Sequence, residues 1–289
     1  MRNFDIVHPS SWAEALGLLS GGDEGTRAFS GGTALMLMMK SGFYAPTRLI
    51  HLGALEARCS FIEATADGGL LIGAAATLSS VEASPVVQRS APVIAQAMKK
   101  LANVRVRNVA RVGGALAHGD PHMDLPPILA ALGGEVLLCG PDGERTCPVE
   151  SFYTGYLETR LSQGELITGV RLPPQAGWRS AYVKCTTRAA DDWPTVGVAV
   201  SLRVVSGAIA DARIMVGAAT ERLTRLTSAE AALRLGAPDA ATFARAADAA
   251  AQEAVTVDSA SGSAGYKTEL LRVYVRRTLA EALLNGAVQ

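Results

Sequence analysis

The chain has 289 residues, of which 49% are hydrophobic, and its 27 basic side chains balance 27 acidic ones. This length fits one large or two modest domains. A neutral balance gives no reason to expect a nucleic acid or an anionic membrane surface as partner. No apolar run is long enough to cross a bilayer, and residues 1–5 lack the apolar core of a signal peptide. We therefore expect a cytoplasmic chain without direct membrane insertion.

The N-terminal part predicts a small β-α-β unit over residues 1–54. Ser11 and Glu14 form a capping-box pattern that begins a helix ending near Leu19. A strand at 27–30, a short helix at 35–40 and a strand at 47–52 follow.

Residues 55–175 have the pattern of a second α+β subdomain. The predicted strands are 61–64, 69–74 and 135–139, with turns at 67–68 and 142–143 and helices at 92–102 and 126–132. The Pro- and Gly-containing segment 173–177 is the best candidate linker, which predicts a domain over 1–175 and another over 176–289.

The C-terminal part predicts an antiparallel sheet followed by three helices. Its strands are expected at 181–186, 196–205 and 209–216, the last two joined by a turn at Ser206-Gly207. Ala-rich helices are expected at 228–235, 239–254 and 264–284. The last of them is expected to bury one apolar stripe, made of Leu270, Val273, Leu279 and Leu283.

Two Gly-Gly pairs, at Gly31-Gly32 and Gly113-Gly114, carry most of the functional information. Each follows a short extended segment. Paired glycines let backbone N–H groups form a concave nest for an anion, helped by the dipole of a following helix. Two such nests suggest a clamp around a diphosphate, whereas either pair alone could be a plain tight turn. Neither G-x-G-x-x-G nor G-x-x-x-x-G-K-[ST] occurs, so a Rossmann site and a P-loop have no support.

The stretch from Val106 to Pro127, RNVARVGGALAHGDPHMDLPP after its first residue, resembles the FAD-binding (medium) subunit of the molybdenum hydroxylases. These are the carbon monoxide dehydrogenase and xanthine dehydrogenase family. The resemblance begins at Phe4, passes through 164–168 and Lys184, and ends at Tyr266-Lys267, so it covers nearly the whole chain.

This resemblance implies an FAD-binding domain of the vanillyl-alcohol-oxidase (PCMH) type with two α+β subdomains. A C-terminal domain with an antiparallel sheet and a three-helix bundle would follow. It implies non-covalent FAD bound by Ala28, Phe29, Ser30, Gly31, Gly32, Thr33, Ala34, Leu35, Leu101, Val112, Gly113, Gly114, Ala115, His118, Asp120, Asp124, Ile167 and Lys184. No metal site is expected on this chain, because its four cysteines are scattered without C-x-x-C spacing.

Several of these residues have a second interpretation. Asp124 could simply cap the helix that begins at Leu125, and Asp120 could be a turn residue before Pro121. His118 is expected to form a wall of the site and not a covalent flavin link.

Two positions depart from the family pattern. Arg111 stands where the family usually has Thr or Ser, and Ala115 replaces an Asn that contacts flavin. Arg111 could bind the diphosphate or lie on the surface.

The segment around Lys184 matches the part of the family that reaches the flavin ring. A cation there stabilises the reduced, anionic ring and raises its reduction potential. Trp193 could flank the ring or belong to the core. Arg188 and Asp192 could pair, and the Tyr266-Lys267 pair is expected to be structural or interfacial.

The resemblance implies an electron-transfer subunit of a larger oxidoreductase. A large subunit would hold the molybdenum–molybdopterin centre and a small subunit two [2Fe–2S] clusters, in a dimer of heterotrimers. FAD on this chain would pass electrons to NAD, quinone or oxygen. A free-standing FAD-dependent oxidase or reductase and a flavin-free scaffold remain as alternatives. The substrate cannot be predicted, because its pocket would lie on another polypeptide.

Overall fold

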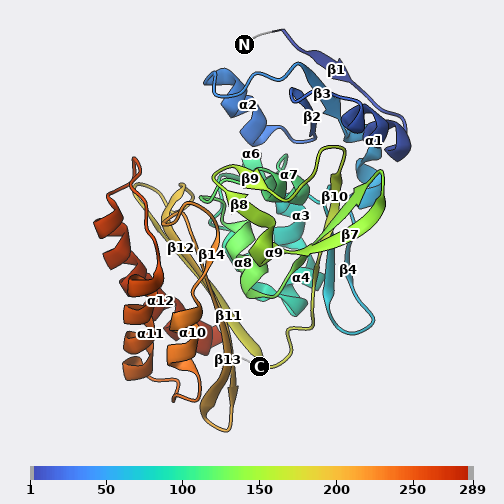
Figure 1. The fold of residues 1–289 in the computed structure, drawn as a ribbon. Helices are drawn as coiled ribbons and strands as arrows, with labels where there is room; N and C mark the ends of the chain where they lie inside the picture. The colour runs from blue at the N-terminus through green and yellow to red at the C-terminus, as the bar shows by residue number, and fades with distance from the viewer. Residues whose placement is uncertain (1–2, 286–289) are drawn as a thin grey trace.

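The structure is a computed structural model that describes residues 3–285. Its N-terminal part is a three-stranded parallel sheet, ordered β1-β3-β2, at one end of the molecule (Figure 1). The elements are β1 (Asp5–Val7), α1 (Trp12–Ser20), β2 (Thr26–Phe29), α2 (Thr33–Lys40), β3 (Arg48–His51) and the 3₁₀ helix η1 (Gly53–Cys59). The predicted β-α-β unit is confirmed, and β1 is a third strand that the sequence did not predict.

The start of α1 differs from a capping box by one residue. The Ser11 hydroxyl accepts a hydrogen bond from the Glu14 N–H at 3.2 Å, as expected. The Glu14 carboxylate, however, accepts from the N–H and hydroxyl of Ser10, at 2.8 and 2.7 Å. Ser11 is therefore the N-cap of α1, as its motif predicts, but the reciprocal bond from Glu14 holds the residue before the cap.

The middle part is a five-stranded antiparallel sheet with helices packed around it (Figure 1). The order is β4-β5-β10-β6-β7, so β10 enters between two hairpins. The strands are β4 (Ile62–Ala64), β5 (Leu70–Gly73), β6 (Glu135–Gly140), β7 (Gly143–Pro148) and β10 (Leu166–Leu172), with β8 (Tyr153–Gly155) and β9 (Glu158–Thr159) as a separate pair. The helices are α3 (Leu78–Ala83), α4 (Pro85–Ser90), α5 (Pro92–Met98), α6 (Val104–Arg107), α7 (Val112–Ala117), α8 (Leu125–Ala131) and α9 (Val149–Phe152).

The C-terminal part is an antiparallel sheet in chain order, with a layer of helices on one face (Figure 1). Its elements are β11 (Trp178–Thr186), β12 (Pro194–Val205), β13 (Ala208–Gly217), β14 (Thr224–Arg225), α10 (Thr227–Leu233), α11 (Ala240–Glu253) and α12 (Ala264–Asn285). The turn between β12 and β13 has positive φ at both Ser206 and Gly207, the backbone of a two-residue hairpin.

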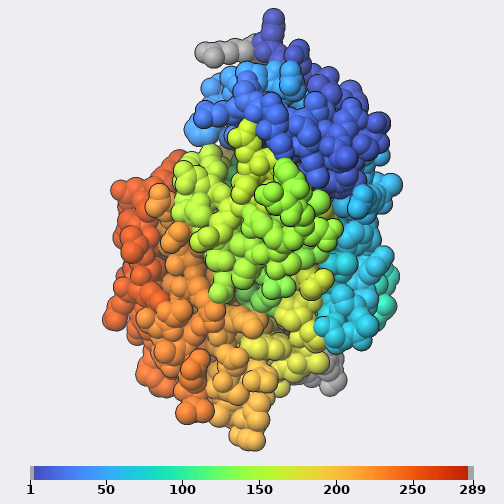
Figure 2. All heavy atoms as spheres, turned by 45° about the vertical axis from the view of Figure 1, so that its right-hand side comes forward, coloured from blue at the N-terminus to red at the C-terminus, as the bar shows by residue number. Residues whose placement is uncertain are grey.

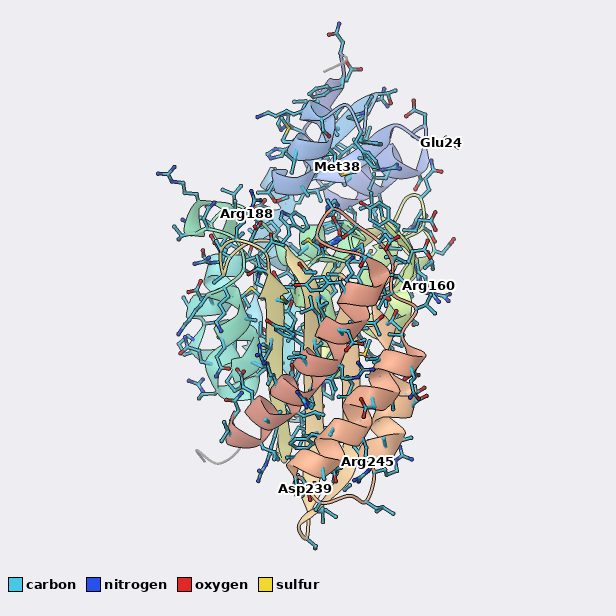
Figure 3. All side chains as sticks on the ribbon, turned by 90° about the vertical axis from the view of Figure 1, so that its left-hand side faces the viewer. Glu24, Met38, Arg160, Arg188, Asp239 and Arg245 are labelled. Atoms are coloured by element: carbon cyan, nitrogen blue, oxygen red, sulfur yellow. The ribbon has the colours of Figure 1, made fainter. Side chains whose placement is uncertain are left out.

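Both faces of this sheet are covered, which explains why Pro194–Leu202 is buried at every position. Val198 and Val200 pack under the helices, whereas Ala199 and Met215 join the core of the middle part, where α8 packs against the sheet. Figure 2 shows the N-terminal part seated above the other two without a break on that face. Figure 3 shows α11 and α12 side by side over the strands, with Asp239 at the start of α11.

The buried face of α12 differs from the predicted stripe. Leu279 is buried as expected, but Leu270, Val273 and Leu283 are only half-buried. The buried face repeats every three or four residues and consists of Lys267, Leu271, Val275, Thr278, Leu279 and Ala282. The packing of α12 against both β11 and α11 selects this face, and a lysine lies on it. None of the helices described in residues 3–285 is long and apolar enough to cross a bilayer.

Candidate functional site

The two glycine turns lie against each other. A Cβ built on Gly31 would lie 2.0 Å from the carbonyl oxygen of Val109, two residues before Arg111. Gly31 is therefore required because the N-terminal and middle parts meet there backbone to backbone. Gly32 has φ of 65° and is the N-cap of α2, a left-handed conformation that favours glycine. The topology thus joins two turns about eighty residues apart in sequence.

The first turn presents a row of free backbone donors. Within residues 3–285, the N–H groups of Gly31, Gly32, Thr33 and Ala34 have no protein acceptor. They lie at the N-terminus of α2, where the helix dipole favours an anion. This is the local geometry of an anion-binding nest.

The second turn contributes less than its sequence predicts. The N–H groups of Val112 and Gly113 donate to the carbonyls of Ala76 and Ala74, at 3.0 and 2.8 Å. A Cβ on Gly113 would lie 2.8 Å from that of Ala74, so this glycine is needed for packing. Gly114 is exposed, a Cβ there would meet nothing within 4 Å, and its N–H has no acceptor in the described chain. Of this pair, Gly114 alone combines open space beside its Cα with an N–H that has no acceptor within residues 3–285.

Glu56 of η1 links the two turns, although no sequence motif marked it. Arg111 Nη2 lies 2.8 Å from Glu56 Oε2, and the Ser30 hydroxyl donates to the other carboxylate oxygen. Burial raises the pKa of Glu56, but the hydrogen bonds from Arg111 and Ser30 outweigh it and hold the pKa below its usual value. Arg111 is therefore paired with Glu56, which argues against binding of the diphosphate by its guanidinium. The pair instead holds the second turn next to the first.

Asp120 organises the loop that follows α7. His122 Nδ1 and the His122 N–H lie 2.7 and 2.8 Å from Asp120 Oδ1, and His118 Nε2 lies 3.8 Å from Oδ2. Burial lowers the pKa of His118, and the Asp120 carboxylate opposes that shift. The Asp120 carboxylate accepts a hydrogen bond from the His122 N–H, as in an Asx turn. These contacts are those of the turn residue that the sequence offered as one alternative.

Asp124 occupies the N-cap position of α8, but its backbone is helical and its side chain makes no capping hydrogen bond, which corrects the prediction that it simply caps this helix. Its carboxylate instead accepts from the Tyr182 hydroxyl at 2.6 Å and from Lys184 Nζ at 3.2 Å, both on β11. Lys184 Nζ also donates to the Asp192 carbonyl at 2.9 Å. Burial raises the pKa of Asp124, although Lys184 and Tyr182 oppose it. A buried ion pair thus joins the C-terminal sheet to the segment after α7.

The loop after β11 reaches the same region. Trp193 is 47% exposed, which excludes an ordinary core position, and its ring lies edge-on to His122 with centroids 6.2 Å apart. The predicted pair of Arg188 and Asp192 is present at 3.2 Å. Figure 3 shows Arg188 at the end of the molecule that carries Met38 of α2.

The remaining predicted residues are buried to different degrees. Leu101, Val112, Ala115 and Ile167 are buried in the main core cluster. Ala28 and Leu35 are half-buried, and the half-buried Phe29 packs against His51 with ring centroids 4.8 Å apart. Of the predicted residues, Asp124 contacts Lys184, and His118 lies 3.8 Å from Asp120, whereas Ser30 of the first turn is linked through Glu56 to Arg111. Within residues 3–285, no group of three His, Cys, Asp or Glu side chains could hold a metal ion.

Comparison with known proteins identifies this architecture. Residues 2–175 match the model of the FAD-binding domain in molybdopterin dehydrogenase, and residues 181–282 match that of the carbon monoxide dehydrogenase flavoprotein C-terminal domain. The chain is a medium, FAD-binding subunit of the molybdenum hydroxylase family. It is 32% identical to the carbon monoxide dehydrogenase medium chain of Hydrogenophaga pseudoflava over 96% of both chains. It is 31% identical to the nicotine 6-hydroxylase medium subunit of Paenarthrobacter nicotinovorans over 95% of both.

Solved structures agree with this assignment to the medium subunits. A carbon monoxide dehydrogenase from Hydrogenophaga pseudoflava, described as lacking the Mo-pyranopterin moiety of its molybdenum cofactor, matches with a TM-score of 0.93 at 34% identity over 98% of both chains. Quinoline 2-oxidoreductase from Pseudomonas putida 86 matches with a TM-score of 0.92 at 26% identity. The α+β fold with a C-terminal sheet-and-helix unit is thereby confirmed, as is the prediction of an oxidoreductase subunit.

The residues of this medium subunit fit FAD. An FAD diphosphate needs several backbone donors and close approach of the main chain, and the free N–H groups of 31–34 and the open position at Gly114 supply both. The loss of the family Asn at Ala115 does not remove these donors, because they belong to the backbone. Ala115 itself is buried.

Proposed function

We propose that this chain binds FAD non-covalently with the diphosphate at the N-terminus of α2, facing Gly114. The observation that carries the proposal is the run of backbone N–H groups at Gly31–Ala34 that have no acceptor within residues 3–285, on a turn whose Gly31 packs against Val109 in the segment leading to Gly114. Asp120 and His118 would line the site further along, and Phe29 and Leu35 would flank the first turn.

We propose that the flavin ring points toward Lys184 and Trp193. The partly exposed Trp193 ring offers an aromatic face, and Lys184 supplies a cation anchored by Asp124. When bound, FAD supplies redox chemistry in one- or two-electron steps. The chain positions it and sets its potential through Lys184.

The wider assignment is an electron-transfer role within a larger complex. We propose that electrons come from two [2Fe–2S] clusters on a small partner subunit and leave through this chain's FAD to NAD, quinone or oxygen. A large molybdopterin subunit would oxidise the substrate, in a cytoplasmic dimer of heterotrimers. The four cysteines are all free, as in proteins of reducing compartments. We further propose a functional division of the chain into 1–175 and 176–289.

Titration of the full chain with FAD tests the proposal. The parent chain should form a yellow, saturable and reducible complex, and Gly114→Val should abolish it because the side chain would fill the only open position of the second turn. Gly265→Val is the matched control, since a Cβ at Gly265 of α12 also meets nothing within 4 Å. A Gly114→Val chain that binds FAD as tightly as the parent would show the site model to be wrong.

The alternatives predict other outcomes. A free-standing oxidase or reductase would turn over a substrate without partner subunits. A flavin-free scaffold would co-purify with molybdenum and iron but release no flavin when the complex is denatured. Co-purification of a yellow chain with both metals supports the electron-transfer subunit.

A further inference from the structure

Lys267 is a fully buried lysine on α12 that the flavin site does not explain. Its side chain has no exposed surface, and its ammonium donates to the carbonyl of Ala218 at 3.1 Å. Within residues 3–285 the ammonium has no second hydrogen-bond acceptor. A buried cation with so few partners is costly, and burial lowers its pKa despite the nearby Asp258 carboxylate. A leucine at this position would avoid the cost of burying a charge, but it could not donate a hydrogen bond to the Ala218 carbonyl.

The carbonyl that Lys267 holds belongs to a strained turn after β13. Ala218 has φ of 64°, and the Ala219 N–H donates across it to the Gly217 carbonyl at 2.8 Å. This three-residue turn with positive φ at a non-glycine residue is rare, and it persists only where its surroundings enforce it. The Lys267 ammonium fixes the central carbonyl of the turn from one side.

The other side of the turn contacts the loop 119–124, which follows α7 and which we call the flavin loop. The Ala218 N–H donates to the Pro121 carbonyl at 2.8 Å, and a Cβ on Gly217 would lie 2.9 Å from the same oxygen. Pro121 stands between Asp120 and His122, the pair that organises this loop. A continuous path of hydrogen bonds therefore runs from Lys267 through Ala218 to the backbone beside Asp120.

We propose that Lys267 is a positioning residue for the flavin loop 119–124, acting through the turn at Ala218. The proposal rests on the proposed FAD site, because the loop matters for function only if flavin lies against it. It predicts that loss of the ammonium lets the turn relax, withdraws support from Pro121 and shifts Asp120 and His122 relative to the flavin. Lys267→Arg keeps a buried cationic donor and should retain the arrangement.

The test compares full-length variants titrated with FAD, using the dissociation constant and the visible circular dichroism of the bound flavin. Lys267→Met should weaken FAD binding about tenfold, the effect of losing one charge-assisted hydrogen bond, and change the flavin dichroism. Lys267→Arg should resemble the parent. Gly217→Ala leaves the lysine in place but crowds the Pro121 carbonyl, and it should weaken FAD binding and change the flavin dichroism as Lys267→Met does. If the Lys267→Met chain does not fold, Gly217→Ala serves as the test of the link between the turn and the loop.

Thr278→Val is the stability control. Thr278 is equally buried on α12, and within the described residues its hydroxyl donates only to the Tyr274 carbonyl of its own helix. It should lower the melting temperature without changing the flavin spectrum. The inference is overturned if the Lys267→Met and Gly217→Ala chains bind FAD like the parent, or if Thr278→Val alters the flavin as they do. A parent chain that binds no FAD would instead refute the proposed function.

Discussion

At the scale of single residues, the charged side chains of the site are already paired before any ligand is considered. Lys184 pairs with Asp124, Arg111 with Glu56, and Asp120 with His122. The free donors that remain are backbone N–H groups, which carry no net charge and need no counter-ion. In the proposed site, these backbone dipoles would hold the anionic diphosphate, and Lys184 would be left to face the flavin ring.

Replacing Lys184 by Ala should keep FAD bound but lower its reduction potential. The cation near the reduced ring is lost, and the Asp124 carboxylate that balanced it remains. The measurement is a spectroscopic redox titration of the reconstituted chain. Arg188→Ala, which removes an exposed cation from the neighbouring loop, is the control. An unchanged potential in Lys184→Ala would remove the lysine from the tuning role and leave the rest of the site model intact.

His118 should make the chain less stable in mild acid. Burial lowers its pKa below 6.5, so below that pH the unfolded state binds the proton more readily than the folded state does. Stability is therefore complete above pH 6.5 and declines as the pH falls through the lowered pKa. His118→Gln should flatten this part of the profile, measured as urea midpoints on both sides of pH 6.5. Equal slopes in parent and variant would contradict a neutral, buried His118.

At the scale of elements, α7 shows that two adjacent glycines can be present for different reasons. Gly113 faces the Ala74 backbone and methyl group, whereas Gly114 faces open space. The first allows a helix to pack on the strand below, and the second leaves room for a ligand. A Gly-Gly motif read from sequence does not separate these roles, because they depend on what lies opposite each Cα.

The two glycines should therefore respond oppositely to alanine. Gly113→Ala should lower the free energy of unfolding by about 1–3 kcal/mol through overpacking. Gly114→Ala should raise it by about 0.5–1 kcal/mol, since alanine is the better helix former. Urea unfolding of the FAD-free chains measures both changes. Similar losses in the two variants would mean that Gly114 is packed and not open.

At the scale of the whole molecule, the C-terminal sheet is part of the same folded body as the flavin-binding part. It shares a core with α8 through Ala199 and Met215, and the Asp124–Lys184 pair lies buried across the junction. The Ala218 turn adds a second link through Pro121. The junction therefore combines apolar packing with a buried polar network.

Asp124→Ala should destabilise the entire chain by about 3–5 kcal/mol, because it leaves the Lys184 charge buried without its partner. Tyr182→Phe should cost less, about 1 kcal/mol, because it removes one hydrogen bond and leaves the ion pair. Calorimetry should show one shifted transition in each case. Two separate transitions would show that the halves unfold independently and that the junction contributes little.

The sequence alone determined the order and type of most elements and the family of the chain. Periodicity, turn residues such as Ser206-Gly207 and the Gly-Gly motifs are local, so they can be read without knowing the fold. What a residue faces is not local. Only the tertiary structure decided that Asp124 pairs with β11 instead of capping α8, that Arg111 pairs with Glu56, and that α12 buries Lys267 instead of Leu270. Each of these contacts joins segments distant in sequence, and packing selects the partners.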